Sequence, residues 1–294
     1  MTLSDLAAGL PGDTALLAPN RQALTYGGLA AQVERTGRLL KQLGFGPHHC
    51  IAVLLPNGPE LASAFLSISS GAAFAPLNPA YSVTEFKFYL EDLQAAALAT
   101  IPGYCPAAEE AAKSLGIGLL RLTPDTAQPA GTFDLSGEGI GKSLAARESE
   151  RRFALLLHSS GTTARPKLVG LTHENLAASA QAIAKTLRLG PGDIGLNVMP
   201  LFHIHGLAGS LLSSLLAGSS VYCPPAFNAL SFAGWMAESR ATWYTAVPSM
   251  HQVLLSRPDA VANLRGHVRF VRSSSAHLHT RVWQEMEARY ECPV

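Results

Sequence analysis

Residues 158–167, HSSGTTARPK, hold the densest group of side chains that could do chemistry. Gly161 lies among four hydroxyl side chains, and Lys167 follows them. The hydroxyls belong to Ser159, Ser160, Thr162 and Thr163. A glycine lets the backbone approach an anion, N–H groups and hydroxyls donate to phosphate oxygens, and an ammonium group supplies a compact positive charge. This composition predicts a polyphosphate-binding loop. An ordinary turn, whose hydroxyls satisfy neighbouring backbone groups, is the alternative.

A second glycine-rich segment, SGEGIGKS at residues 136–143, ends like a P-loop. A P-loop requires a glycine at its first position, where this chain has Ser136, and a buried strand directly before it. The preceding segment lacks the apolar run of such a strand. A P-loop NTPase that uses Gly141, Lys142 and Ser143 is therefore the competing hypothesis for nucleotide binding.

Regular elements are expected on both sides of the first loop. Residues 153–157 form an uninterrupted apolar run, typical of a strand covered on both faces, and residues 174–187 have the pattern of a helix. Upstream, we expect a helix that Gly44 ends, strands at 51–55, 73–76 and 95–101, and helices at 60–70 and 83–93. This alternation predicts an α/β protein with a largely parallel sheet.

Two segments depart from the alternation. Residues 123–143 are rich in Pro, Gly and small polar side chains, so we expect a surface connection near 123–150. Residues 194–237 contain no Asp, Glu, Lys or Arg and would be long enough to cross a membrane. Three prolines and two histidines interrupt them, which favours buried elements joined by turns over a membrane span.

Composition excludes several classes of protein. With 48% hydrophobic and 15% charged residues among 294, the chain can bury a core and is not expected to be disordered. Its net charge of +1 gives no field that would attract nucleic acid or an anionic membrane. The four cysteines form no CxxC pair, and the N-terminus has no basic or apolar leader, so we expect a cytoplasmic protein.

Three sequence motifs, in order along the chain, resemble those of the adenylate-forming superfamily, which includes acyl-CoA synthetases, luciferases and nonribosomal adenylation domains. HSSGTTARPKLVGLTHENL at 158–176 resembles its phosphate-binding signature. PLNPAYSVTEFKFYLED at 76–92 and MPLFHIHGL at 199–207 resemble an upstream signature and the aromatic-His motif. Residues 241–255 and 264–278 are similar to the segments that line the acyl and adenine pockets. FHIHGL and TWYTAVP are most similar to the branch that holds oxalate:CoA ligases.

The resemblance implies two packed, mostly parallel sheets flanked by helices, forming an incomplete large N-terminal domain over residues 1–294. It implies an AMP-forming acid:CoA ligase. A small carboxylic acid would attack the α-phosphorus of ATP, giving an acyl-adenylate and pyrophosphate, and the thiol of CoA would then take the acyl group. ATP, Mg²⁺ and CoA are the implied cofactor and co-substrates.

The same resemblance assigns roles to particular residues. Ser159 to Thr163 and Lys167 would hold the β- and γ-phosphates, and Ser159 would also approach the magnesium. His203 would lie between the acyl carboxylate and the α-phosphate, the alternative being a core histidine satisfied by the backbone. His205 has no partner at a metal-ligand spacing and is interpreted as pocket wall. The adenine base would lie beside the small residues Ser274, Ser275 and Ala276.

Departures from the family pattern lower the expected activity. Ala164 and Leu168 stand where the family loop usually has glycine, and a leucine beside Lys167 could crowd the phosphates. The chain ends before the family's YGxTE-like segment, its ribose-binding aspartate and its C-terminal domain. We therefore expect a fragment with little activity alone, which self-associates through apolar surface at the truncation. A degenerate, non-catalytic binding module is the further alternative.

Overall fold

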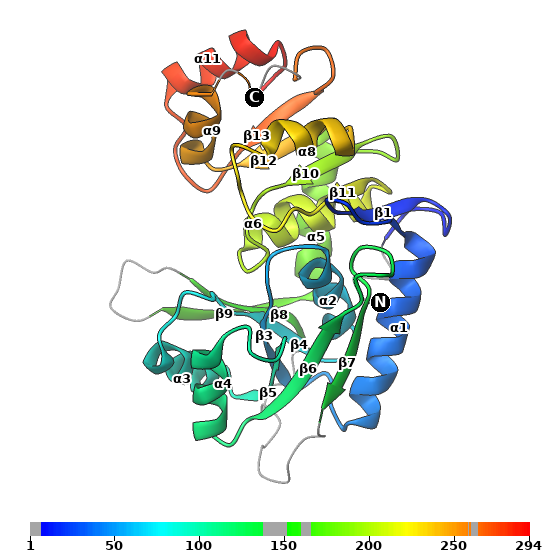
Figure 1. Cartoon of the computed structure of the whole chain (residues 1–294), viewed down its shortest axis with the longest axis vertical. Helices are drawn as coiled ribbons and strands as arrows, with labels where there is room; N and C mark the ends of the chain where they lie inside the picture. The colour runs from blue at the N-terminus through cyan, green and yellow to red at the C-terminus, as the bar shows by residue number, and fades with distance from the viewer. Residues whose placement is uncertain (1–6, 138–151, 160–165, 258, 260–263) are drawn as a thin grey trace.

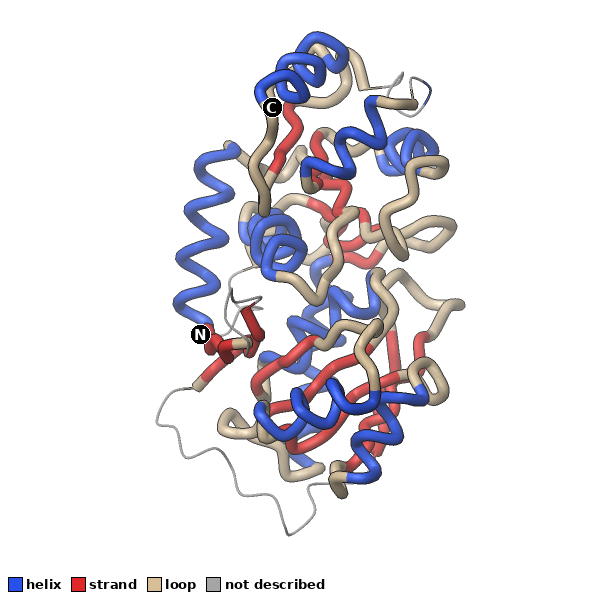
Figure 2. Tube along the Cα trace, turned by 90° about the vertical axis from the view of Figure 1, so that its left-hand side faces the viewer, coloured by secondary structure: helices blue, strands red, loops and turns tan. Residues whose placement is uncertain are grey.

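The computed structural model describes residues 7–137, 152–159, 166–257, 259 and 264–294. Its strands form two separate sheets, which lie one above the other along the long axis of the molecule (Figure 1) and again form separate groups in the view turned by 90° (Figure 2). The two-sheet α/β architecture predicted through the family resemblance is therefore confirmed.

The first sheet carries seven strands in the order β7-β6-β5-β3-β4-β8-β9. They are β3 (Cys50–Leu54), β4 (Ala73–Pro76), β5 (Ala95–Thr100), β6 (Gly118–Pro124), β7 (Phe133–Gly137), β8 (Phe153–Ser159) and β9 (Lys167–Thr172). The inner strands pair in parallel, and the two outer pairs, β6 with β7 and β8 with β9, are antiparallel.

Helices cover both faces of this sheet, which explains why its central strands are apolar throughout. Strand β3 is buried at every position, with Ile51 and Val53 in one core and Ala52 and Leu54 in the other. The first core includes side chains of α1 (Tyr26–Gln42) and α2 (Pro59–Ser69), and the second those of α3 (Val83–Asp92) and α4 (Pro106–Ser114). Successive strand residues point to opposite faces, so an uninterrupted apolar run is what two covered faces require.

The second sheet has six strands in the order β13-β12-β10-β11-β1-β2. They are β1 (Thr14–Leu17), β2 (Leu24–Thr25), β10 (Ile194–Asn197), β11 (Ser220–Tyr222), β12 (Trp243–Ala246) and β13 (Phe270–Ser273). All neighbours pair in parallel except β1 and β2. A third core joins this sheet to α8 (Phe232–Ser239), α9 (Pro248–Leu255) and α11 (Thr280–Tyr290).

Between the sheets lie α5 (His173–Leu187), α6 (Ile204–Gly206), the π-helix η2 (Leu207–Leu212) and α7 (Ser213–Leu216). The charge-free segment 194–237 thus forms buried strands and short helices. Within the described residues, no helix has the length and apolarity needed to cross a membrane. Trp243 and Tyr244, on β12, are completely buried and belong to the core rather than to a pocket wall.

The segment expected to be a surface connection differs from the prediction. Its first part completes β6, and residues 133–137 form β7, in which Phe133 is completely buried and pairs with Pro124. Apolar and polar residues alternate from Phe133 to Ser136, a period that the surrounding Pro and Gly concealed. Residues 138–150 lie outside the described part of the chain.

Strand β7 also bears on the P-loop hypothesis, because it places a strand before GIGKS where the sequence predicted none. This strand is an antiparallel edge strand, and it already contains Ser136 and Gly137 from the P-loop-like segment. A P-loop instead follows a buried parallel strand. Gly141, Lys142 and Ser143 lie outside the described residues.

Candidate functional site

The β8–β9 hairpin carries the two ends of the predicted phosphate loop. Its register pairs Ser159, the last residue of β8, with Lys167, the first residue of β9. The serine and the lysine therefore lie opposite each other where the loop begins and ends. Ser160, Gly161, Thr162, Thr163 and Ala164 fall outside the described residues. Both described ends of the loop therefore rest on strands of the large sheet.

Leu168 does not share the side of the hairpin that carries Lys167. It pairs with His158 and packs, half-buried, against the core formed by α3 and α4. Side chains alternate along a strand, so Lys167 and Val169 point to the other face. The expected crowding of the lysine by Leu168 therefore has no support in the strand geometry.

A cavity of about 330 Å³ opens beside this end of the hairpin. Its walls come from β8, β9 and the segment before α6, and they consist of Leu157, His158, Ser159, Val169, Leu171, Phe202, His203 and Ile204. The structure thus brings His203 to the cavity that Ser159 lines, although the two are far apart in the sequence. Lys167 lies at the mouth of the same hairpin, opposite Ser159.

His203 is available to a ligand rather than satisfied in a core. The residue is exposed, its ring lies 4.5 Å from that of Phe202, and within the described part of the chain its nitrogens make no hydrogen bond. Partial desolvation of the ring lowers the pKa of His203 below its usual value of 6.5, which favours the neutral ring at pH 7. A neutral imidazole carries one N–H donor and one acceptor nitrogen.

His158 anchors the end of β8 to α3. Its Nε2 lies 2.8 Å from Oδ2 of Asp92, and its ring meets that of Tyr89 edge-on at 4.7 Å. Tyr89 in turn stacks on Tyr81 at 4.5 Å. Tyr81, Tyr89 and Asp92 all belong to the upstream signature at 76–92, so two of the recognised motifs touch each other directly.

His205 joins three segments of the second half of the chain. It is 6% exposed, with Nδ1 2.9 Å from Oγ of Ser275 and Nε2 2.6 Å from Oγ1 of Thr245. Burial, with a smaller contribution from the charge of Arg272, lowers the pKa of His205 to about 4. The ring is therefore neutral at pH 7, and one hydroxyl donates to it while the other accepts from it.

The predicted adenine-flanking residues follow β13 directly. The N–H of Ser274 donates to the carbonyl of Ala246 at 3.3 Å, whereas Ser275 and Ala276 are exposed. Ser275 has φ +73°, a left-handed conformation that costs a non-glycine residue energy, and its hydroxyl is bonded to His205. These residues lie at the carboxyl end of parallel strands, where open α/β sheets bind their ligands.

Comparison with known proteins decides the family. A family model described as AMP-binding enzyme matches residues 3–294. The chain belongs to this family of AMP-binding enzymes. Its relatives include a probable CoA ligase, CCL9, from Humulus lupulus, 38% identical over 99% of this chain, and an oxalate–CoA ligase from Arabidopsis thaliana, 37% identical over 99%. A sulfoacetate–CoA ligase from Cupriavidus necator is 33% identical over 97%.

The chain spans little more than half of these AMP-binding relatives, namely 57%, 60% and 56% of their lengths. Solved structures agree on the fold. ATP-bound MatB from Rhodopseudomonas palustris matches all of this chain and 59% of its own, with a TM-score of 0.81 at 24% identity. The anthranilate CoA ligase AuaEII in complex with anthranoyl-AMP matches with a TM-score of 0.82 at 20% identity, over 100% of this chain and 58% of that one.

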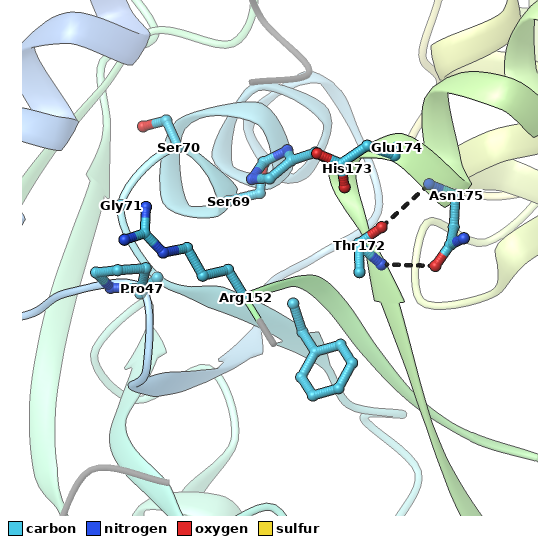
Figure 3. Close-up of a pocket in the computed structure, with 11 residues that line it drawn as sticks. Pro47, Ser69, Ser70, Gly71, Arg152, Thr172, His173, Glu174 and Asn175 are labelled. Atoms are coloured by element: carbon cyan, nitrogen blue, oxygen red, sulfur yellow. Dashed lines mark hydrogen bonds between the residues drawn. The ribbon is translucent and has the colours of Figure 1, made fainter. Parts of the chain in front are cut away.

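A larger cavity, of about 550 Å³, lies at the opposite end of the β8–β9 hairpin of this AMP-binding enzyme. Figure 3 shows Arg152, which precedes β8, extending towards Pro47 and Gly71. Thr172 and Asn175 face each other there, each backbone N–H donating to the other's side chain at 3.2 Å. These bonds form the N-cap of α5. None of the predicted site residues lines this cavity, so the motifs direct attention to the smaller one.

Proposed function

We propose that the chain is the larger part of an AMP-forming acid:CoA ligase, which activates a small carboxylic acid with ATP and transfers the acyl group to CoA. One observation carries the proposal: Ser159, which pairs with Lys167 at the end of the hairpin, lines the same cavity as the exposed His203. Family membership and the CoA ligase relatives agree with it. The relatives' named acids, oxalate and sulfoacetate, are both small.

In this proposal the hairpin holds the leaving group. An oxygen of the substrate carboxylate bonds to the α-phosphorus as the bond from that phosphorus to the β-phosphate oxygen breaks, so negative charge builds up on pyrophosphate. Lys167 offsets that charge, and Ser159 with the loop residues Ser160, Gly161, Thr162 and Thr163 donates hydrogen bonds to the phosphate oxygens. Fixed donors and charges of this kind lower the barrier mainly by positioning and electrostatics.

His203 acts on the other side of the reacting bond. Its neutral ring can donate one N–H to an oxygen of the carboxylate or of the α-phosphate. An imidazolium there would instead attract the carboxylate as a counter-ion and reduce its nucleophilicity. Ser274, Ser275 and Ala276 supply a low wall for the adenine, where a bulky side chain would block the base.

Magnesium enters the proposal with ATP. Within the described residues, no three His, Cys, Asp or Glu side chains converge as a metal site, and Ser159 offers one oxygen. Mg²⁺ keeps several waters and commonly binds substrate phosphates. The described residues therefore fit a metal carried by the triphosphate, with Ser159 as its only proposed protein ligand.

We further propose that residues 1–294 are one incomplete large domain and have little activity without the rest of the ligase. Exposed apolar side chains at Val253 on α9 and Trp283 on α11 offer a surface for the self-association expected from the sequence. All four cysteines are buried, and Cys105, Cys223 and Cys292 are free thiols, in keeping with a reducing, cytoplasmic location.

Calorimetric titration with ATP and Mg²⁺ tests the proposal against its rivals. Replacing Lys167 by Ala should weaken ATP binding about tenfold, because one charge-assisted contact is lost. Lys142→Ala and the exposed control Lys185→Ala should leave the affinity unchanged. Loss of binding in Lys142→Ala alone would favour the P-loop NTPase. If none of the three substitutions changed the affinity for ATP, the assignment of the hairpin as the phosphate-binding site would be overturned.

A further inference from the structure

The end of the β8–β9 hairpin extends beyond the strand that borders it in the sheet. Within the described residues, β4 pairs with β8 at one position, Phe74 with Leu155, whereas the pairing with β9 continues to Ser159 and Lys167. Beyond Leu156, this part of β8 therefore pairs only with β9. A two-stranded ribbon is marginally stable by itself, so the hairpin end needs support from another element.

Helix α3 supplies a contact at this place. Successive side chains of a strand alternate, so His158 turns away from the face that carries Leu157 and Ser159. Its Nε2 lies 2.8 Å from Oδ2 of Asp92, the last residue of α3, which lies beside the hairpin (Figure 1). An ionised carboxylate can only accept, so the ring N–H donates. The side chain of His158 is 8% exposed, and Tyr89 packs edge-on against its ring, so the ring is shielded from water.

The helix that carries Asp92 is fixed at both its start and its buried face. Ser82 and Glu85 form a capping box at the first turn. Phe86 and Leu90 are completely buried in the core that α3 shares with β3, β4 and β8. The contact between Asp92 and the hairpin can therefore hold the hairpin end against the body of the sheet.

An acidic side chain at the end of α3 is unfavourable for the helix itself. The C-terminus of a helix carries partial negative charge, and the last turn of α3 contains Glu91 and Asp92 and no basic residue. The charge of Asp92 would also repel a polyphosphate bound at the hairpin end. Neither helix stability nor direct contact with phosphate explains an acid at this position, whereas the hydrogen bond to His158 does.

We infer that Asp92 is a positioning residue, which holds the end of β8 through His158 so that Ser159 faces Lys167 and the cavity. The inference rests on the proposed function. It gives the upstream signature at 76–92 a role, which is to fix the strand that carries the phosphate-binding residues. Donors that are already in place lose less entropy when a ligand binds, so loss of the contact should weaken the binding of ATP.

Calorimetric titration of the 294-residue protein with ATP and Mg²⁺ tests the inference. Asp92→Asn keeps the shape of the side chain and removes its charge. We expect about fivefold weaker binding, a modest effect because the side chain of Asp92 is 41% exposed. Removing a negative charge near phosphate would by itself strengthen binding, so the direction of the change separates positioning from electrostatics. The exposed control Glu91→Gln removes the same charge one residue away and should leave the affinity unchanged.

Three further variants separate positioning from stability. His158→Phe keeps a ring against Tyr89 but has no N–H, so it should weaken ATP binding as much as Asp92→Asn, and the double variant should lose no more than either alone. Asp92→Glu keeps the carboxylate and should retain most of the affinity. Leu122→Ala removes a completely buried side chain from β6, four strands away from β8 in the sheet. It should lower the urea midpoint and leave the affinity for ATP unchanged.

The outcomes distinguish this inference from the proposed function. Unchanged affinity in Asp92→Asn or in His158→Phe, losses that add in the double variant, or an equal loss in Leu122→Ala would each overturn the inference. Weaker binding in Lys167→Ala with unchanged binding in Asp92→Asn would overturn the inference alone. Weaker binding in Asp92→Asn and His158→Phe with no effect of Lys167→Ala would overturn the assignment of the phosphates to the hairpin. A wild type that does not bind ATP would overturn both.

Discussion

Replacing His205 by Ala should be among the most destabilising changes near the site, because this ring connects α6, β12 and the segment after β13. Both ring nitrogens are hydrogen-bonded, at 2.9 Å to Ser275 and 2.6 Å to Thr245. Thr245 is completely buried, so its hydroxyl cannot turn to water after the ring is removed. The substitution therefore leaves a buried polar group unsatisfied as well as a cavity.

The loss of stability can be worked out from the two hydrogen bonds that disappear and the hydroxyl that is left without a partner. A net intramolecular hydrogen bond is worth about 1 kcal/mol, and a buried hydroxyl left without a partner costs about 1–3 kcal/mol. We therefore expect the His205→Ala variant to lose about 3–4 kcal/mol of unfolding free energy at pH 7. His203→Ala removes an exposed ring without hydrogen bonds in the described part of the chain, and should change stability by about 0.5 kcal/mol or less.

The difference in unfolding free energy between wild type and the His205→Ala variant should become smaller as the pH falls. The pKa of His205 is about 4 in the folded protein, against a usual value of 6.5. Between these values the unfolded chain takes up a proton that the folded chain does not, so stability falls as the pH falls from 6.5 to 4. The histidine accounts for about 3 kcal/mol of that fall, which the variant does not share.

Urea unfolding at pH 7, 6, 5 and 4.5, followed by circular dichroism, measures both effects. His203→Ala, which shares the chemistry but not the burial, serves as the control. Equal losses in the two variants at pH 7 would refute the connecting role of His205. If the difference in unfolding free energy between wild type and His205→Ala stayed constant across the pH series, the neutral, buried state of His205 would be refuted.

Two further changes test the packing around the site. Asp193 accepts two hydrogen bonds of 2.8 Å from Arg269 and one of 2.7 Å from Thr242. Asp193→Asn should therefore lower the unfolding free energy by about 2 kcal/mol, as measured by urea titration. An unchanged urea midpoint would contradict the pairing of Asp193 with Arg269. Gly209→Ala places a methyl group 2.7 Å from Nη1 of Arg272 and should cost about 1–3 kcal/mol, seen as a lower melting temperature; a rise in Tm would show that the helix preference of Ala prevails.

Much of the architecture was predictable from local patterns. The continuous apolar runs of β3 and β8, and the helix that Gly44 ends at φ +87°, are fixed by short-range periodicity and by the turn that follows them. β7 was missed because its alternation covers only Phe133 to Ser136 within a Pro- and Gly-rich segment. Four residues are too few to predict a strand from their alternation alone, and the strand is stabilised by its pairing with β6.

The site was predictable only in part. The motif around Lys167 and the histidine at 203 are visible in the sequence, but the meeting of Ser159 and His203 at one cavity depends on how the segment before α6 lies against the hairpin. The bond from His205 to Ser275 spans 70 residues, and that from His158 to Asp92 spans 66, so no local pattern could signal either.

A crystal structure of the protein with a non-hydrolysable acyl-adenylate analogue, soaked with pyrophosphate, tests the central claim most directly. We expect the pyrophosphate between Ser159 and Lys167, the acyl-phosphate mimic within hydrogen-bonding distance of His203, and the adenine beside Ser274 to Ala276. Binding in the cavity beside Arg152, or adenine remote from β13, would contradict the account.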